Sequence, residues 1–541
     1  MSFNPLENRY PSRRSVVYGK KGMVCTSQTL AAQAGLDILK KGGNAIDAVL
    51  TTAICMTVLE PTSNGLGSDA FALVWIKKDA RLYGINGSGY APKQLTKDNL
   101  AKLGIEDKIP DRGWLPVTVP GAPSAWAEIH KKFGKLPFAD LFTAAITYAE
   151  EGFPVQPIVG DLWKRAEKVF APYKDKPEFK PFYDTFMPNG KAPAIGGLVK
   201  LPDHAKTLRL LAESKCESYY RGEIAEAIDK FSRETGGLLR KEDLADYHAE
   251  WVEPIHTNYH GYDVCEIPPN GHGIVALMTL NIINQLKLEN GNHDDVTTIH
   301  KQLEAMKLAF TDGKTYVADS RYMKKMNVTY MLGEEYATKR AQEINDLALE
   351  PKPVDPHCGG TVYLCAADEE GNMISYIQSN YKGFGSGIVV PGYGISFNDR
   401  GSDFSLDPNK DNYLVPGKKP YHTIIPGFLM KDGKAVGPFG VMGGYMQPQG
   451  HVQVMMNLID FGMNPQDALD APRWQWVGGK KIELEPGFGE EVAKELLKRG
   501  HEVKVNTDFT GFGRGQIILR NEEGVLVGAT EPRTDGVVAV W

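Results

Sequence analysis

The chain has 541 residues, of which 42% are hydrophobic and 24% are charged, a composition typical of a soluble globular protein. Its 61 basic and 67 acidic residues give a net charge of −6 without any basic block, which argues against a nucleic-acid partner and against an anionic membrane surface. Neither a secretory signal nor a bilayer-length apolar segment is apparent, so we expect a cytoplasmic protein.

Helical periodicity dominates the first two thirds of the chain. It predicts helices at 29–41 and 45–59, the second apolar on nearly all sides and capped by Asn44. Two strands are expected at 70–76 and 81–87. Further helices are predicted at 122–133, 138–151, 204–213, 223–235 and 296–318.

The pattern changes at residue 359. A strand is predicted at 361–368, a turn at 369–372 and a returning strand at 373–379. Strands and glycine-rich turns then continue to about residue 445, before helices at 450–461 and from Pro465 and a set of terminal strands. Strands at both ends of the chain, without an internal repeat or linker, predict one interleaved α+β unit.

Cysteine and histidine spacing gives no sign of a metal centre. The six cysteines are scattered without a Cys-x-x-Cys pair, which excludes a zinc ribbon and a disulfide framework. His256 and His260 lie in extended chain, where residues four apart are roughly 13 Å from each other, too far to share a zinc ion. We therefore predict no metal and no cofactor.

Gly359-Gly360-Thr361 is the segment most open to a catalytic interpretation. A threonine at a chain's own N-terminus can act as a nucleophile, because its α-amine serves as the base. Cleavage of the preceding peptide would create that terminus, and two flexible glycines would let the hydroxyl reach the carbonyl. The same residues are also an ordinary turn before a strand, so they leave both interpretations open.

Several segments together resemble the γ-glutamyltransferase family, in the family's order and across nearly the whole chain. They are GGNAIDAV (42–49), VTVPGA (117–122), EAMKLAF (304–310), GGTVY (359–363), GFGSGI (383–388), MGG (442–444), DAPRW (470–474) and the late Asp535-Gly536. The resemblance implies a four-layer αββα sandwich of the N-terminal-nucleophile hydrolase type. It also implies a cut between Gly360 and Thr361.

The implied cut divides the chain into a large, mostly helical segment, 1–360, and a small, strand-rich segment, 361–541, which stay intertwined. A homodimer of this two-chain unit remains open. By the same resemblance Thr361 is the nucleophile, Ser379 orients it, and the backbone amides of Gly443 and Gly444 form the oxyanion hole.

The positions implied to bind substrate depart from the family pattern. Ser88 replaces the arginine that clamps the glutamyl carboxylate, and serine cannot supply that bidentate contact. The other candidate substrate-binding residues are Tyr381, Arg400, Asp403, His422 and Thr423, of which only Asp403 keeps the family identity. Arg400 has two interpretations: a new carboxylate contact, or a turn-bracing pair with Asp399 or Asp403.

These departures resemble the branch that includes cephalosporin acylases. We expect a self-processing amidohydrolase or acyltransferase that cleaves γ-glutamyl or related dicarboxylic-acyl amides through an acyl-threonine, with water or an amine as acceptor. A glutaryl-type cephalosporin acylase is the alternative within the family. A family member that stays uncut and only binds ligands is the alternative from another class, and a denaturing gel distinguishes it.

Overall fold

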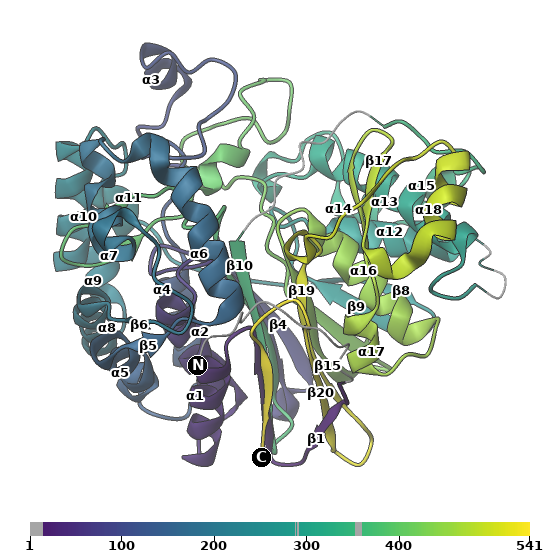
Figure 1. The fold of residues 1–541 in the computed structure, drawn as a ribbon, viewed down its shortest axis with the longest axis horizontal. Coiled ribbons are helices and arrows are strands. Elements are labelled where there is room, and N and C mark those ends of the chain that lie inside the picture. The colour runs from purple at the N-terminus through teal and green to yellow at the C-terminus, as the bar shows by residue number, and fades with distance from the viewer. Residues whose placement is uncertain (1–13, 287, 289–290, 352–359) are drawn as a thin grey trace.

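A computed structural model describes residues 14–286, 288, 291–351 and 360–541, and in it two seven-stranded antiparallel sheets stack face to face (Figure 1). Residues 355–359 of the expected processing segment lie outside the described residues. We call the two sheets the β10 sheet and the β15 sheet after their central strands.

The β10 sheet carries the strand that begins with Gly360 and Thr361. Its strands, in spatial order, are β21 (Val537–Val540), β2 (Gly22–Thr26), β10 (Gly360–Asp368), β11 (Met373–Tyr381), β3 (Asp69–Ile76), β4 (Arg81–Gly87) and β7 (Glu250–Val252). The strands β2, β3, β10 and β11 are buried along their whole lengths apart from Gly360, as expected for a sheet covered on both faces.

The β15 sheet is built mainly from the C-terminal third of the chain. Its strands, in spatial order, are β1 (Val17–Gly19), β20 (Leu526–Thr530), β19 (Arg514–Arg520), β15 (Lys434–Met442), β14 (Gly427–Lys431), β9 (Tyr262–Glu266) and β8 (Ile255–Tyr259). Apolar side chains from both sheets, among them Phe71, Tyr363, Phe428 and Ile518, form the core between them.

Helices cover the outer face of each sheet (Figure 1). The helices packed with the β10 sheet are α1 (Thr29–Lys40), α2 (Ala45–Leu59), α4 (Ala122–Phe133), α5 (Thr143–Glu151), α6 (Pro157–Phe170), α7 (Lys180–Phe186), α8 (Pro202–Ser214), α9 (Glu217–Arg221), α10 (Glu223–Glu234) and α11 (Lys241–Ala245). Those packed with the β15 sheet are α12 (Gly273–Gln285), α13 (Val296–Tyr316), α14 (Val328–Met331), α15 (Glu334–Ala341), α16 (Met446–Ile459), α17 (Pro465–Asp470) and α18 (Gly489–Lys498).

Smaller elements complete the fold. They are α3 (Lys97–Lys102), the pair β5 (Phe153–Pro154) and β6 (Leu198–Val199), the pair β12 (Val389–Val390) and β13 (Ile395–Ser396), and the sheet of β16 (Trp474–Gly478), β17 (Lys481–Leu484) and β18 (Glu502–Val505). Helix, sheet, sheet, helix is the order of the four layers. The predicted αββα sandwich is therefore confirmed.

The predicted helix 45–59 shows how the local sequence sets an element. α2 has these bounds, every one of its residues is buried, and Asn44 and Asp47 form a reciprocal capping box at its start. Such a box satisfies two backbone donors that the first turn leaves without intrahelical partners.

Two helical predictions differ clearly from the structure. Residues 138–151 form a 3-10 turn, η2 (Phe138–Phe142), before α5, and the threefold spacing of this turn buries Phe138 and Leu141 on one side. α16 begins at Met446 rather than at residue 450, because a helix tolerates proline, here Pro448, in its first turn. Several helices, among them α6 and α12, were not predicted from the sequence.

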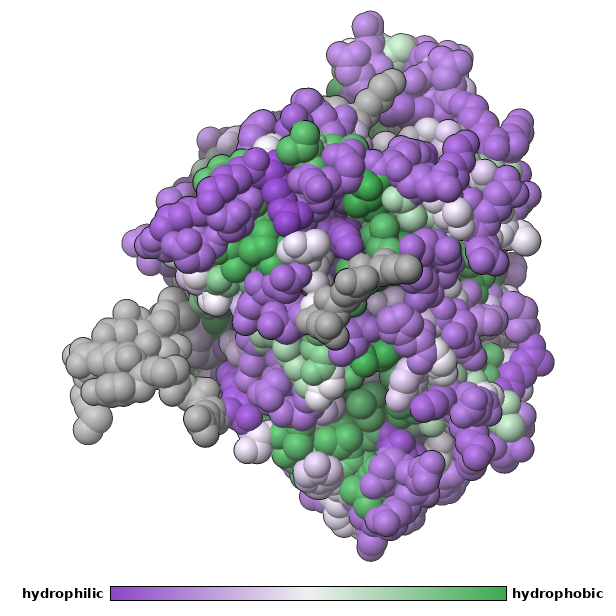
Figure 2. All heavy atoms as spheres, turned by 90° about the vertical axis from the view of Figure 1, so that its right-hand side faces the viewer, coloured by the Kyte–Doolittle hydropathy of each residue, from purple (hydrophilic) through white to green (hydrophobic). Residues whose placement is uncertain are grey.

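Among the described residues, no helix combines the length and apolar character that crossing a bilayer requires. The face shown in Figure 2 is mostly hydrophilic, with smaller apolar patches between the polar side chains.

Candidate active site

Thr361 is the second residue of β10 and is fully buried. The β10–β11 register shifts between Gly360 and Val362, a bulge-like irregularity that falls on Thr361. Such irregularities re-aim side chains and are frequent beside active sites. Here the Thr361 hydroxyl points to β11 and donates to Ser379 Oγ at 3.0 Å.

Ser379 is the centre of the hydrogen-bond network. Its hydroxyl donates to the carbonyl oxygen of Gly360 at 2.8 Å, and its oxygen accepts from the backbone N–H of Tyr381 at 2.8 Å. Arg400 Nη2 also lies 3.3 Å from the same oxygen. Ser379 is fully buried and bonded to Thr361, which agrees with the predicted orienting role and rules out a solvent-facing strand-end serine.

Arg400 belongs to the short turn η7 (Arg400–Asp403) and is fully buried. Besides Ser379 it donates to Thr423 Oγ1 at 2.6 Å, and its guanidinium lies 4.0 Å from the centre of the Tyr381 ring. Asp403 is 3.7 Å away, whereas Asp399 pairs with Arg112 instead. The turn-bracing interpretation therefore holds only for Asp403, and Arg400 in addition contacts Ser379, which bonds Thr361.

Asp403 is held by two phenols. The hydroxyls of Tyr381 and Tyr445 donate to its Oδ1 at 2.9 and 3.1 Å, while its buried Oδ2 has no hydrogen-bond partner among the described residues. Tyr381 adopts a φ of +80°, a conformation that costs free energy in a residue with a side chain and that tends to persist at functional sites. The Tyr381 ring packs against the Arg400 guanidinium, and its hydroxyl reaches Asp403.

His422 lies beside the network rather than in it. Its Nε2 donates to Asp69 Oδ2 at 2.9 Å, because its Nδ1 accepts from the backbone N–H of Ile424. Burial lowers the pKa of His422 well below its ordinary value and raises the pKa of Asp69 to about 7, against the opposing effect of the Arg400 charge. Asp69 is the β3 partner of Ser379, so Asp69 and His422 lie next to the residue that bonds Thr361.

Ser88 is buried behind His422. Its hydroxyl donates to Asn86 at 2.7 Å and accepts from the side-chain amide of Asn270 at 3.2 Å, and the backbone of Asn270 in turn accepts from His422 N–H. Among the described residues, none of the hydrogen bonds of Ser88 reaches Arg400 or Ser379, so a substrate-binding role for Ser88 stays a prediction.

Gly443 and Gly444 follow β15 and precede α16, with φ of 145° and 59°. The antiparallel pairing of β14 with β15 brings Thr423, which precedes β14, to the end of the sandwich where β15 reaches Gly443. Tyr445, the next residue, contacts Asp403. The glycine pair therefore lies at the same end of the molecule as Thr361, as the oxyanion role requires.

A cavity of about 430 Å³ opens beside Gly360, within the usual size range of small-molecule sites. A larger one, about 790 Å³, lies between the turns at the other end of the two sheets, near Gly371 and Gly524, away from Thr361.

Two residues of the candidate site, Asp69 and Tyr445, were not predicted from the sequence. Asp69 begins a strand in an otherwise apolar run, and a buried carboxylate at a strand end is a signal that could have been used. Tyr445 directly follows the glycine pair, so its proximity followed from the sequence once the pair was assigned.

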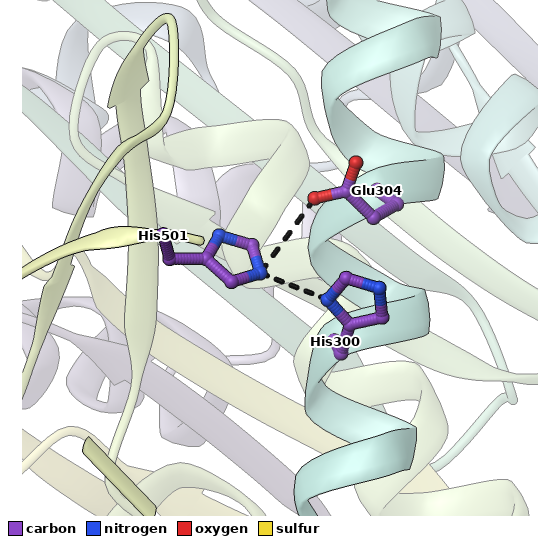
Figure 3. A group of neighbouring side chains, drawn as sticks. All are labelled: His300, Glu304 and His501. Carbon is purple, nitrogen blue, oxygen red and sulfur yellow. Dashed lines mark hydrogen bonds and ion pairs between the residues drawn. The ribbon is translucent and has the colours of Figure 1, made fainter. Parts of the chain in front are cut away.

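A separate group of buried side chains has the composition of a metal site: His300 and Glu304, one turn apart on α13, with His501 (Figure 3). His300 Nδ1 and His501 Nε2 are 2.8 Å apart, a hydrogen-bond distance, whereas two nitrogens on one tetrahedral zinc would stand roughly 3.3 Å apart. Lys307 Nζ lies 2.7 Å from Glu304 Oε1 and 3.4 Å from His501 Nδ1, and His300 Nε2 lies 2.8 Å from the Asn345 carbonyl. These contacts form a continuous hydrogen-bond chain. His256 and His260 do not belong to this group.

The comparisons with known proteins agree with this geometry. Residues 31–541 match the family model described as Gamma-glutamyltranspeptidase. The chain is 34% identical over 527 residues to the glutathione hydrolase-like YwrD proenzyme of Bacillus subtilis (strain 168), covering 96% of this chain and 98% of that protein. It is 33% identical over 530 residues to the oxamate amidohydrolase proenzyme of Klebsiella pneumoniae, with the same coverages.

Among solved structures, the cephalosporin acylase from Bacillus halodurans is 57% identical, with a TM-score of 0.96 and coverage of 100% of this chain and 99% of that one. The chain belongs to the gamma-glutamyltranspeptidase family of self-processing amidohydrolases, as its resemblance predicted.

Proposed function

We propose that this enzyme hydrolyses amides whose acyl group ends in a carboxylate, with Thr361 as the nucleophile. The observation that carries the proposal is the placement of Arg400: a fully buried guanidinium that contacts Ser379, which itself bonds Thr361. A cation held this close to the reacting atoms suits a dicarboxylic monoamide.

Processing would use the same residues. Thr361 Oγ attacks the carbonyl carbon of Gly360, the C–N bond breaks as the nitrogen gains a proton, and water hydrolyses the resulting ester. The Ser379 hydrogen bond to the Gly360 oxygen polarises that carbonyl. Because the full chain has a mass of 59.6 kDa, the cut gives fragments of roughly 40 and 20 kDa.

In turnover, the freed α-amine of Thr361 takes the hydroxyl proton as Oγ attacks the substrate carbonyl, and passes it to the leaving amine. The amides of Gly443 and Gly444 hold the oxyanion, for which a backbone without side chains allows close approach. An acyl-threonine forms, and water or an acceptor amine releases the acyl group.

Two acyl classes suit the charged groups Arg400 and Asp403. A glutaryl group needs only the cation of Arg400, and the 57% identical cephalosporin acylase supports this class as the first candidate. A γ-glutamyl group also carries an ammonium, for which the unbonded Oδ2 of Asp403 is available, and the glutathione hydrolase-like relative supports this second candidate.

The test compares the 4-nitroanilides of glutaric, γ-glutamic and butyric acids, the last being an uncharged analogue of the glutaryl group. We expect the purified protein to migrate as two fragments and to prefer one or both charged acyl groups at least tenfold in kcat/KM. Equal rates with the butyryl substrate would refute the role of Arg400. A single uncut, inactive species would favour the non-catalytic binding protein.

A further inference from the structure

A second arginine, Arg514, flanks the proposed oxyanion pair on the other side. It is the first residue of β19 and pairs in the ladder with Met442, which directly precedes Gly443. Only 6% of Arg514 is exposed, and its Nε and Nη1 have no hydrogen-bond partner among the described residues. Buried guanidinium donors without partners are rare in proteins, because each costs free energy unless a ligand fills the place.

The nearest acid does not satisfy Arg514. Glu60 Oε1 stands 3.7 Å from Arg514 Nη1, beyond hydrogen-bond distance. Both Glu60 oxygens already accept from serine hydroxyls, Oε2 from Ser27 at 2.7 Å and Oε1 from Ser63 at 2.8 Å. Glu60 therefore offsets part of the charge of Arg514 but leaves its N–H groups available.

Arg514 lines the cavity of about 430 Å³ beside Gly360. The apolar part of the wall includes Val169, Phe170 and Phe384. The cavity thus offers an apolar surface and a buried cation side by side, next to the peptide that Thr361 is proposed to cut.

The other cations on this wall are already paired. Arg112 lies 3.1 Å from Asp399, and Lys382 lies 2.6 Å from Asp111. Arg165 lies 2.6 Å from Asp508. Arg514 is thus the cation of the wall that keeps unused donors, Nε and Nη1, in the described part of the chain.

Strand order places Arg514 and the partner of Arg400 on opposite sides of the strand that leads to Gly443. β15, which leads to Gly443, lies between β14 and β19. Thr423 and its partner Arg400 are on the β14 side, and Arg514 is on the β19 side. A substrate carbonyl held at Gly443 would then direct its acyl group toward Arg400 and its leaving amine toward Arg514.

We infer that Arg514 binds a carboxylate on the leaving amine, and that the cavity beside Gly360 holds the apolar body of that amine. The inference rests on the proposed function, because it assumes that Thr361 is the nucleophile and that the glycine pair holds the oxyanion. The preferred leaving group is then an apolar, ring-sized amine that bears an anionic group.

The test uses two leaving groups that differ by one carboxylate, 4-nitroaniline and 5-amino-2-nitrobenzoate, each as the glutaryl and γ-glutamyl amide. In Arg514→Gln, we expect kcat/KM for the carboxylated substrates to fall about ten- to a hundredfold, and for the uncharged ones less than about threefold. Arg514→Lys should recover part of the loss. Arg209→Gln, an exposed arginine paired with Glu150, serves as the control and should change neither rate.

An equal loss with both leaving groups would overturn the inference, because it would show that Arg514 supports the structure or the chemistry alone. Product inhibition of the unmodified enzyme gives a second measurement if the variant fails to mature. 5-Amino-2-nitrobenzoate should inhibit at least ten times more strongly than 4-nitroaniline, and equal inhibition would also overturn the inference. Failure of the unmodified enzyme to hydrolyse any of the four substrates would instead refute the proposed function.

Discussion

The hydroxyl of Ser379 donates a 2.8 Å hydrogen bond to the carbonyl oxygen of Gly360, the acyl half of the peptide proposed to be cut. The same hydroxyl oxygen lies 3.0 Å from the Thr361 hydroxyl, the proposed attacking group. One side chain therefore contacts both reacting groups of the uncut chain.

Ser379→Ala should slow maturation, because the Gly360 carbonyl loses a polarising donor whose removal from an oxyanion site typically costs about a hundredfold in rate. The fraction of uncut chain on a denaturing gel, followed over time, measures this. Ser379→Thr should mature nearly normally. Ser375→Ala is a matched control, since this buried β11 serine contacts Tyr363 rather than the peptide, and a similar delay there would contradict the prediction.

Gly444→Ala keeps the backbone N–H but adds a Cβ where the substrate must approach closely, so it should displace the oxyanion from its donor and lower kcat by up to about a hundredfold. The substitution also introduces backbone strain, because Gly444 has a φ of 59°. Gly462→Ala controls for this strain: its φ is 62° and an added Cβ would meet open space. Equal activity losses in the two variants would mean that the pair acts through folding alone.

Arg400→Ala should lower kcat/KM about ten- to a hundredfold for both glutaryl and γ-glutamyl substrates, because both acyl groups lose the carboxylate contact. Asp403→Asn should reduce only the γ-glutamyl rate by a comparable factor, since only that acyl group carries an ammonium. A γ-glutamyl preference that survives Asp403→Asn would show that the ammonium is bound elsewhere.

Asp69 should make stability pH-dependent. Burial raises its pKa in the folded protein to about 7, above the value of about 3.9 for an unperturbed aspartate. Its contribution is therefore fully present below pH 4 and is lost as the pH rises to 7. The Asp69→Asn variant has no group that titrates here. The difference in unfolding free energy between the variant and the parent should therefore shift in favour of the variant by at most about 4 kcal/mol between pH 4 and 7, and should not change further above pH 7. Denaturant unfolding in the Thr361→Ala background, where the chain stays whole, measures the difference. Parallel curves would contradict the prediction.

Chelation should leave the enzyme unchanged if His300, Glu304 and His501 form a hydrogen-bond chain rather than a metal site. Treatment with a strong chelator should alter neither activity nor the thermal midpoint. His501→Ala should cost about 2–4 kcal/mol of stability, because His300 and Lys307 lose a buried partner. One equivalent of zinc per chain, with destabilisation on its removal, would contradict this assignment.

Local patterns predicted the elements better than the contacts between them. α2 and its Asn44 cap follow from residues within one turn of each other. The pairing of Ser379 with Asp69, in contrast, depends on how β11 registers against β3, some three hundred residues earlier, and no local periodicity encodes that register.

Arg400 illustrates the same limit within the site. The sequence left its partner open between Asp399 and Asp403, both close along the chain. In the structure Asp399 pairs with Arg112, which lies far earlier in the sequence. Arg400 instead contacts the hydroxyls of Thr423 and Ser379, and the local sequence does not indicate that these residues lie near it. Asp399 and Asp403 are equally plausible partners from their positions in the sequence, and only tertiary packing distinguishes them.

The order of the β10 sheet has a consequence for the mature enzyme. β2, from the large segment, lies between β21 and β10, both from the small segment, so a cut before Thr361 leaves each piece hydrogen-bonded within the other. Once such an enzyme unfolds, two separate polypeptides diffuse apart, and recovery requires a bimolecular encounter. Its durability would then be set by how slowly it unfolds and by its concentration, rather than by an equilibrium within one chain.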